Sequence, residues 1–420
     1  MAFGKKINEK NMTAHYKHTI RRKWLHLCSL FLCTGLLTTA CSNNIEEASE
    51  GMASTAPVIQ VEVSTSTLNA NDHLVDYPDT TTLMGTQHVT HVMLYIFKGS
   101  DETAEYCGQF EEVKWKEHFT ANGGMLPIHS VQMNHRLKTQ LERNTPYQFL
   151  AVGTNDEGHE TFNVPLNPSA EGQKGTTLTE ALGKLKETAT VQKIRRSEIF
   201  VGLKAYHPEN HIATRITLRR RVAGVAGWFK NVPAEVAAPL TQGVTDRRLS
   251  KLRIALYTAQ NTVLPLIKRQ QKPDFEDFIA SASSEDDATT LVEIPITPDN
   301  TSKGTEQTFT GGSFVLPIPA PADKEKYTLR IELVNKEGQV LDVRRAKLPK
   351  NDELDHGSTG GGTGIIDTES AYRFPIVANH YYGLGSPHKP IDLKGSGADL
   401  TITVDPTWNE EADLELGEKN

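Results

Sequence analysis

Pro57-Val58-Ile59-Gln60-Val61-Glu62-Val63-Ser64 is the stretch of this 420-residue chain that decides its fold. Ile59, Val61 and Val63 alternate with polar residues. Because side chains point to opposite faces of a strand with a period of two, this pattern places the three apolar residues on one face. We therefore expect a first strand over residues 58–68, with one face packed on a core.

The same alternation recurs along the chain, at residues 252–256, 329–333 and 400–404. Residues 89–97 are almost continuously apolar, which is typical of a strand buried on both faces. Thr177 and Glu180 form a capping-box pattern before Leu178, Leu182 and Leu185, which predicts one short helix. Many short strands with turn signals between them predict a mainly β protein made of sandwiches with a few short helices.

The N-terminal region predicts export. Arg21, Arg22 and Lys23 precede an apolar run, and small residues then lead to Cys41. This order is that of a secretory signal, and the cysteine makes residues 1–40 look like a bacterial lipoprotein signal with lipidation at Cys41. Leu37 lies one position earlier than such signals usually place it, so an ordinary signal cut elsewhere is the alternative. An uncleaved membrane anchor is disfavoured because the run is shorter than roughly 20 residues.

The rest of the chain divides into a tether and two domains. Residues 41–56 are rich in Ser, Asn, Glu and Ala and predict a solvated tether. The segment His207-Pro208-Glu209-Asn210 interrupts the strand pattern. We therefore expect an N-terminal β-sandwich over residues 57–210 and a C-terminal β-sandwich over residues 211–420.

Several classes of function are disfavoured by composition. The net charge is −7 and no basic stripe is present, which argues against nucleic acid. Cys28 and Cys33 fall in the signal and Cys41 is the lipid site, so Cys107 alone remains and predicts neither a disulfide nor a zinc site. The chain has no His-Glu-x-x-His and no Gly-x-Ser-x-Gly, and its glycine run lacks a phosphate-loop lysine. We expect no enzyme, no metal and no cofactor.

Several segments resemble the fimbrillin superfamily, the lipoprotein precursors of type V fimbriae in Bacteroidales. They are VMLYIFKG at 92–99, EIFVG at 198–202, LRRRVAGV at 218–225, FPIVANHYY at 374–382 and the region 399–408.

The resemblance implies two tandem transthyretin-like β-sandwiches that assemble by strand exchange. In polymerising members an Arg-specific protease removes the first strand, and a neighbour's C-terminal strand fills the vacated groove. The implied partners are other fimbrial subunits, the outer membrane through lipid on Cys41, and host or bacterial surface ligands. The implied location is the surface of the outer membrane and the fimbrium.

This sequence departs from that pattern in one respect. No arginine occurs between Cys41 and Arg136. An Arg-specific cut could not release a strand at residues 58–68 while sparing the fold. We therefore expect Ile59, Val61 and Val63 to stay in a retained first strand, which suits a terminal subunit, either a base anchor or an accessory tip component.

Two further questions stay open at the level of sequence. Leu400, Ile402 and Val404 are either a donor strand for another subunit or the closing strand of the second sandwich. A surface glycan-binding lipoprotein of a nutrient-uptake system is the alternative function, and an exported enzyme on a β-sandwich is a third. Aromatic residues make up only 7% of the chain, which disfavours the glycan-binding alternative.

Overall fold

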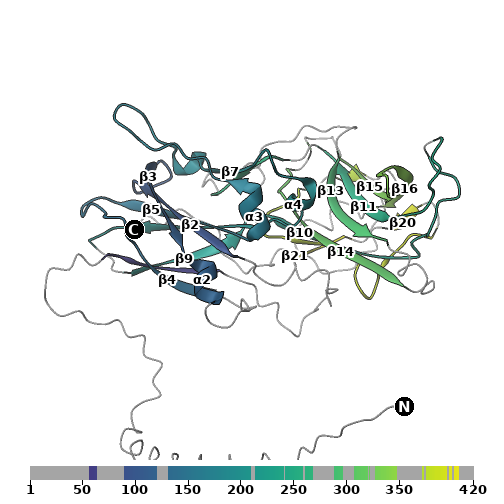
Figure 1. The fold of residues 1–420 in the computed structure, drawn as a ribbon, viewed down its shortest axis with the longest axis horizontal. Coiled ribbons are helices and arrows are strands. Elements are labelled where there is room, and N and C mark those ends of the chain that lie inside the picture. Colours follow the sequence, from purple (N-terminus) through teal and green to yellow (C-terminus); the bar gives the residue numbers. More distant parts are fainter. Residues whose placement is uncertain are drawn as a thin grey trace, which may run out of the picture. The chain divides into compact units, whose positions relative to one another are not determined.

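The fold is mainly β, as the alternating sequence predicts (Figure 1). The computed structural model describes residues 56–63, 89–120, 131–209, 213–240, 242–258, 261–267, 288–296, 307–319, 321, 327–347, 371–372, 375–394, 397–399 and 402–405. All of these residues belong to one compact unit, residues 55–420. Within the described ranges, no helix has the length and apolar character needed to span a membrane.

The N-terminal half forms a seven-stranded sheet with the order β3-β2-β5-β8-β9-β1-β4. Its strands are β1 (Val58–Val63), β2 (His91–Lys98), β3 (Glu105–Val113), β4 (Val131–Arg136), β5 (Tyr147–Thr154), β8 (Ile199–Tyr206) and β9 (Ala213–Arg220). Neighbouring strands are antiparallel except β1 and β9, which are parallel.

One hydrophobic cluster, here called the first core, collects alternate side chains from both halves of this sheet. Its members include Ile59, Val61, Val63, Val92, Leu94, Ile96, Phe149, Ala151, Phe200, Ile216 and Leu218. Strands far apart in the order meet in this cluster, so the sheet folds over its own core as a sandwich. β5 is buried along its whole length, whereas β2 buries one face and leaves the other half-buried. The run at 89–97 is therefore less enclosed than its sequence predicts.

The helix predicted from Thr177 is wrong. The capping box forms, and the Thr177 amide donates to Glu180 Oε2 at 2.9 Å. It caps only the single 3₁₀ turn η2 (Leu178–Glu180), and the chain then enters strand β7 (Leu182–Leu185). β7 pairs with β12 (Val263–Pro265) and β6 (Phe162–Asn163) in a small three-stranded sheet, so pairing with distant segments outweighs the local helix signal.

The helices within the described residues are short. They are α2 (Trp115–Thr120), α3 (Asp156–Thr161) and α4 (Val191–Ile194). Asn155 caps α3 by accepting a hydrogen bond from the Gly158 amide at 2.7 Å. Gly158 itself has no room for a side chain, because an added Cβ would lie 2.2 Å from the Glu198 carbonyl oxygen.

The C-terminal half is a second sandwich of two sheets. One has the order β14-β10-β18-β21 with β19 beside β10, and the other has the order β13-β11-β15-β16-β20 with β17 beside β15. The strands are β10 (Ala223–Lys230), β11 (Lys251–Tyr257), β13 (Thr289–Pro295), β14 (Thr308–Val315), β15 (Tyr327–Val334), β16 (Val340–Lys347), β17 (Ala371–Tyr372), β18 (Tyr381–Leu384), β19 (Ile391–Asp392), β20 (Gly397–Asp399) and β21 (Ile402–Asp405).

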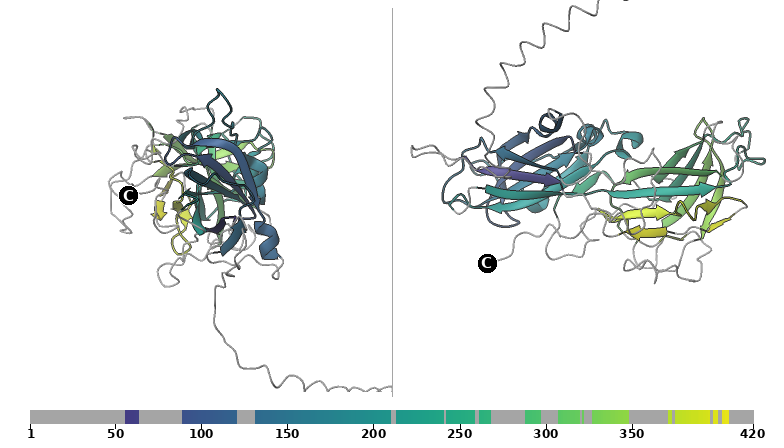
Figure 2. Two further views of the ribbon diagram at one scale, coloured as in Figure 1. Left: turned by 90° about the vertical axis from the view of Figure 1, so that its left-hand side faces the viewer. Right: turned by 90° about the horizontal axis from the view of Figure 1, so that it is seen from below.

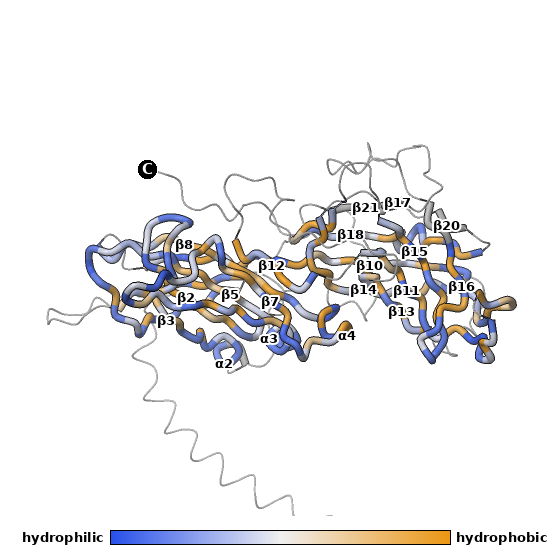
Figure 3. Tube along the Cα trace, turned by 90° about the horizontal axis from the view of Figure 1, so that it is seen from above, coloured by the Kyte–Doolittle hydropathy of each residue, from blue (hydrophilic) through white to orange (hydrophobic). Residues whose placement is uncertain are grey.

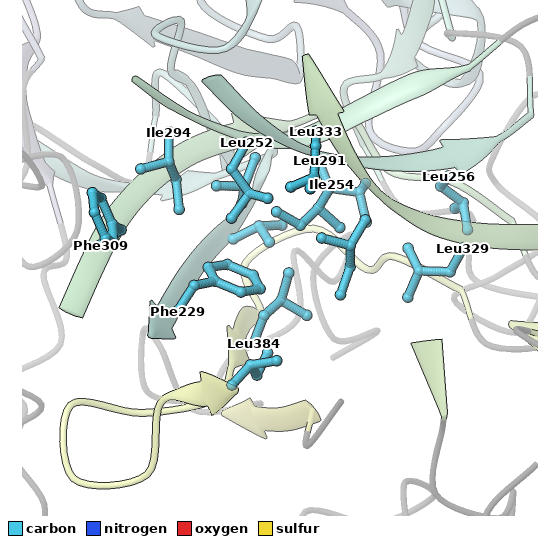
Figure 4. Close-up of a cluster of buried hydrophobic side chains, with 14 of the residues drawn as sticks. Phe229, Leu252, Ile254, Leu256, Leu291, Ile294, Phe309, Leu329, Leu333 and Leu384 are labelled. Atoms are coloured by element: carbon cyan, nitrogen blue, oxygen red, sulfur yellow. The ribbon is translucent and has the colours of Figure 1, made fainter. Parts of the chain in front are cut away.

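The second core lies between these two sheets (Figure 4). Phe229, Phe309 and Leu384 of the first of them face the cluster together with Leu252, Ile254, Leu256, Leu329 and Leu333 of the other. The predicted alternations at 252–256 and 329–333 are thus the inward faces of β11 and β15.

A third cluster, the middle core, is shared by both halves of the chain. It contains Leu150, Val152, Ile199 and Val201 from β5 and β8, and Ala226, Trp228, Phe314 and Tyr381 from β10, β14 and β18. Hydrophobic segments run along the strands that supply these cores (Figure 3). The boundary predicted at residues 210–211 falls between β8 and β9 of one sheet, and the second sandwich begins with β10.

Candidate functional site

The most informative site is the position that β1 occupies between β4 and β9 in the seven-stranded sheet, here called the seat of β1. β1 lies between antiparallel β4 and parallel β9, with Ile59 opposite His135 on one side and Thr214 on the other. Ile59, Val61 and Val63 are fully buried in the first core. Without β1, the sheet would lose the connection between β9 and β4 and would expose an apolar groove between them.

The outer face of β1 is cross-linked by polar side chains. Arg215 Nε on β9 donates to Gln60 Oε1 at 2.7 Å and lies 3.6 Å from Glu62 Oε2. Thr217 Oγ1 donates to Glu62 Oε1 at 2.6 Å. On the other side Gln60 Nε2 donates to Asn134 Oδ1 of β4 at 3.4 Å. Both faces of β1 therefore hold it in register with its neighbours.

Arg136 is the first arginine after Cys41, and it is an exposed residue of β4 opposite Val58. A cut after Arg136 would separate β1 to β4 from the rest of the chain, and these strands supply much of the first core. The structure thus places the first arginine within the sheet itself.

A buried polar contact joins β3 and β4, the two ends of the seven-stranded order. His135 Nε2 lies 2.8 Å from Glu111 Oε2, and the amides of Lys138 and Thr139 donate to Glu111 Oε1 at 2.8 and 2.6 Å. Burial alone would raise the pKa of Glu111, but hydrogen bonds from Thr139, His135 and Lys138 outweigh it and lower that pKa. No sequence pattern indicates this contact, because Glu111 and His135 are distant in the chain.

The C-terminal segment is split between two sheets. β20 pairs in parallel with β16, whereas β21 pairs antiparallel with β18, with Ile402 opposite Leu384 and Val404 opposite Tyr382. Each is the last strand of its sheet order. Leu400 lies outside the described residues, as does Cys41.

A cluster of titratable side chains lies where β2 begins. The rings of His91 and His159 stack with centroids 4.0 Å apart. Asp156 accepts hydrogen bonds from Lys116 at 3.0 Å and Thr90 at 2.8 Å, and its Oδ1 lies 3.1 Å from His91 Nε2. In the part of the chain that the structure describes, no group of three or more His, Cys, Asp or Glu residues is arranged to hold a metal ion.

The exposed surface of the first sheet carries one aromatic side chain that stands out. Phe110 on edge strand β3 is 57% exposed, and its ring centroid lies 6.3 Å from that of half-buried Tyr95 on β2. Cys107 on the same strand is half-buried, and its Sγ donates to the Ile96 carbonyl oxygen at 3.0 Å. Burial is the main reason that the pKa of Cys107 is raised, so the thiolate is disfavoured.

Comparison with known proteins gives similarities among solved structures only. No protein-family model matches the sequence, and no curated protein matches it. A putative adhesin from Bacteroides thetaiotaomicron is 11% identical with a TM-score of 0.39, covering 84% of this chain and 96% of its own. A fimbrial assembly protein from Parabacteroides distasonis is 13% identical with a TM-score of 0.34, covering 83% and 98%.

The tip fimbrial protein Mfa3 from Porphyromonas gingivalis, with a C-terminal truncation, is 9% identical with a TM-score of 0.34 and has the same two coverages, 83% and 98%. These three structures are named as a putative adhesin, a fimbrial assembly protein and a tip fimbrial protein, all from Bacteroidales. At these identities and TM-scores they assign neither a family nor a function to the chain.

Proposed function

We propose that this chain is a non-enzymatic structural subunit of a type V fimbria, located at one end of the fibre as a base anchor or an accessory tip component. One observation supports the terminal position most directly. β1 fills the seat between β4 and β9 with three fully buried side chains, and no arginine lies between Cys41 and Arg136 of β4. A neighbour's strand cannot enter this seat while β1 occupies it.

The proposal includes a permanent tether and one exchangeable strand. Lipid on Cys41 holds the chain in the outer membrane, because several acyl chains together give stable anchoring. The segment containing Ile402 and Val404 is the strand offered to a neighbouring subunit. β20 and β21 are each the last strand of their sheet, at its edge. Removing either one therefore leaves the remaining strands of that sheet paired with each other.

The decisive experiment is mass spectrometry of this chain in purified fimbriae. We expect peptides that cover residues 58–63, contiguous with a lipid-modified Cys41. A chain that starts just after residue 68 would overturn the retained first strand. Immunogold labelling then distinguishes the anchor from the tip, because an anchor lies at the base of the fibre and a tip component at its far end.

A matched pair of substitutions makes the protease argument specific. Thr67→Arg introduces an arginine after β1, whereas Thr67→Lys adds the same charge without a site for an Arg-specific protease. We expect such a protease to cleave only the first variant and leave the wild type intact. Release of β1 from the wild type as fast as from Thr67→Arg would contradict the proposal.

A second candidate function, glycan binding at the surface, is favoured by the exposure of Phe110 beside Tyr95. Aromatic faces stack on sugar rings and would supply such a site. Saturable binding on a glycan array that Phe110→Ala abolishes would support this alternative. If the protein binds no glycan, or if Phe110→Ala leaves binding unchanged, the glycan site at Phe110 is rejected. The fimbrial subunit then remains the proposed function.

A further inference from the structure

We propose that β1 and β9 form a mechanical clamp that keeps the protein attached when its N-terminal side is pulled. The two strands pair in parallel over six positions, from Val58 opposite Ala213 to Val63 opposite Leu218. Figure 2 shows β1, in purple, alongside the strands of the first sheet. This is the only parallel pair among the described strands of the seven-stranded sheet.

The direction of the two strands decides how tension acts on them. The chain enters β1 at Val58, next to the start of β9, and it leaves β9 at Arg220, the opposite end. From there it passes into β10 of the second sandwich. Tension between the chain before β1 and the second sandwich therefore pulls β1 and β9 along their lengths in opposite directions.

This geometry loads the hydrogen bonds in shear. Hydrogen bonds between strands run across the strand direction, so sliding one strand past another strains the whole ladder at once. Peeling a strand from one end would instead break the bonds one at a time. β4 adds a second ladder on the other side of β1, which must also slide.

Side chains reinforce the pair on both faces. On the outer face, Thr217 donates to Glu62 and Arg215 donates to Gln60, and both bonds link β9 to β1.

On the inner face, Ile59, Val61 and Val63 share the first core with Ile216 and Leu218. Sliding β1 by one residue would turn its apolar face away from that core.

The far end of β9 is itself anchored. Arg220 Nε donates to Glu198 Oε1 of the neighbouring chain segment at 2.8 Å, and the two side chains are 4% and 0% exposed. The Arg220 guanidinium also lies 4.9 Å from the centroid of the Phe200 ring. Tension that reaches β9 is thus passed through Arg220 to the buried residues Glu198 and Phe200.

The proposed function supplies only the source of tension, a lipid on Cys41 pulling against a fibre. The clamp can be measured without a fimbria, by single-molecule force spectroscopy on the chain from Cys41 onward. One handle is attached at Cys41 and the other at Glu337→Cys in the turn between β15 and β16, with Cys107→Ser in every version. Release of β1 is recognised by a length gain of about 3.6 Å for each residue freed.

Two variants weaken the clamp and one serves as the matched control. Thr217→Val removes the hydrogen bond to Glu62, and Gln60→Pro removes backbone hydrogen-bonding capacity from β1. Thr290→Val makes the same chemical change in β13 of the second sandwich, outside the pair. At constant force we expect β1 to release about three- to tenfold faster in Thr217→Val and about tenfold or more faster in Gln60→Pro.

The control should release β1 at the wild-type rate. Equal release rates in the wild type, Thr217→Val and Gln60→Pro would overturn the clamp. If Gln60→Pro does not fold, Thr217→Val against Thr290→Val decides alone. The force measurement tests the clamp alone, and mass spectrometry tests the terminal position alone. Either proposal can therefore fail while the other stands.

Discussion

Ile59 shows how strongly a single side chain fixes the first strand. It is fully buried in the first core, so Ile59→Ala should leave a cavity and lower the free energy of unfolding by about 2–5 kcal/mol. Urea denaturation measures this loss. Gln132→Ala, at an exposed position of neighbouring β4, is the control and should change stability by about 0.5 kcal/mol or less. Similar losses in both variants would show that β1 is not held as described.

The buried pair of Glu198 and Arg220 predicts strong non-additivity. Their side chains are 0% and 4% exposed, so Arg220→Met removes the guanidinium partner of a buried carboxylate and should cost about 3–5 kcal/mol. The double variant Glu198→Gln, Arg220→Met removes both charges and should recover part of that loss. A double-mutant cycle by chemical denaturation measures the coupling. Additive losses would mean that the two charges do not interact in the folded protein.

His159 predicts a pH dependence of stability. Burial, and then the neighbouring His91 and Lys186, lower the pKa of His159 below its ordinary value. The folded protein therefore binds a proton less readily than the unfolded chain, so stability is full above about pH 6.5 and falls as the pH drops through that value. His159→Gln should lose less stability than the wild type between pH 7.5 and 5, measured by denaturation at each pH. An identical slope in both proteins would contradict this assignment.

The elements show where local sequence suffices and where it does not. The alternation of Ile59, Val61 and Val63 predicts a half-buried strand, and β1 buries those three residues. The capping box of Thr177 and Glu180 predicts the correct hydrogen bonds but the wrong element, because β12 pairs with the residues that follow. Periodicity reports which face of a segment is buried, and partners distant in the chain decide what the segment becomes.

The seat of β1 illustrates the same limit at the candidate site. The sequence shows an alternating strand pattern and a stretch without arginine from Cys41 to Arg136, and both features are local. The parallel pairing with β9 and the contact between Glu111 and His135 join residues far apart in the chain. A single sequence carries no signal for such pairings, so the position of the strand in its sheet becomes visible only in the structure.

The C-terminal strands carry a prediction at the scale of elements. β20 and β21 end their sheet orders, so deleting residues 398–420 should leave the protein folded while blocking assembly into fimbriae. Circular dichroism and thermal melting measure folding, and fimbrial yield measures assembly. Loss of folding would instead identify this segment as the closing strand of the second sandwich.

At the scale of the whole molecule, the middle core joins what the sequence predicts as two separate domains. Alternate residues of β10 pack in different clusters, with Ala223, Val225 and Phe229 in the second core and Ala226 and Trp228 in the middle core. The middle core also holds Leu150 of β5 and Val201 of β8. Separating the two halves would expose this cluster to water, so the halves stabilise each other.

This shared core predicts that both halves unfold together. Calorimetry of the wild type should show one transition, with equal calorimetric and van't Hoff enthalpies. Trp228 is 2% exposed in the middle core, so Trp228→Ala should cost about 3–5 kcal/mol and lower protection of backbone amides against hydrogen exchange in both β5 and β11. Ile254→Val, within the second core alone, should cost about 0.5–1.5 kcal/mol. Two separate transitions in the wild type, or loss of protection in β11 alone, would show that the sandwiches are independent.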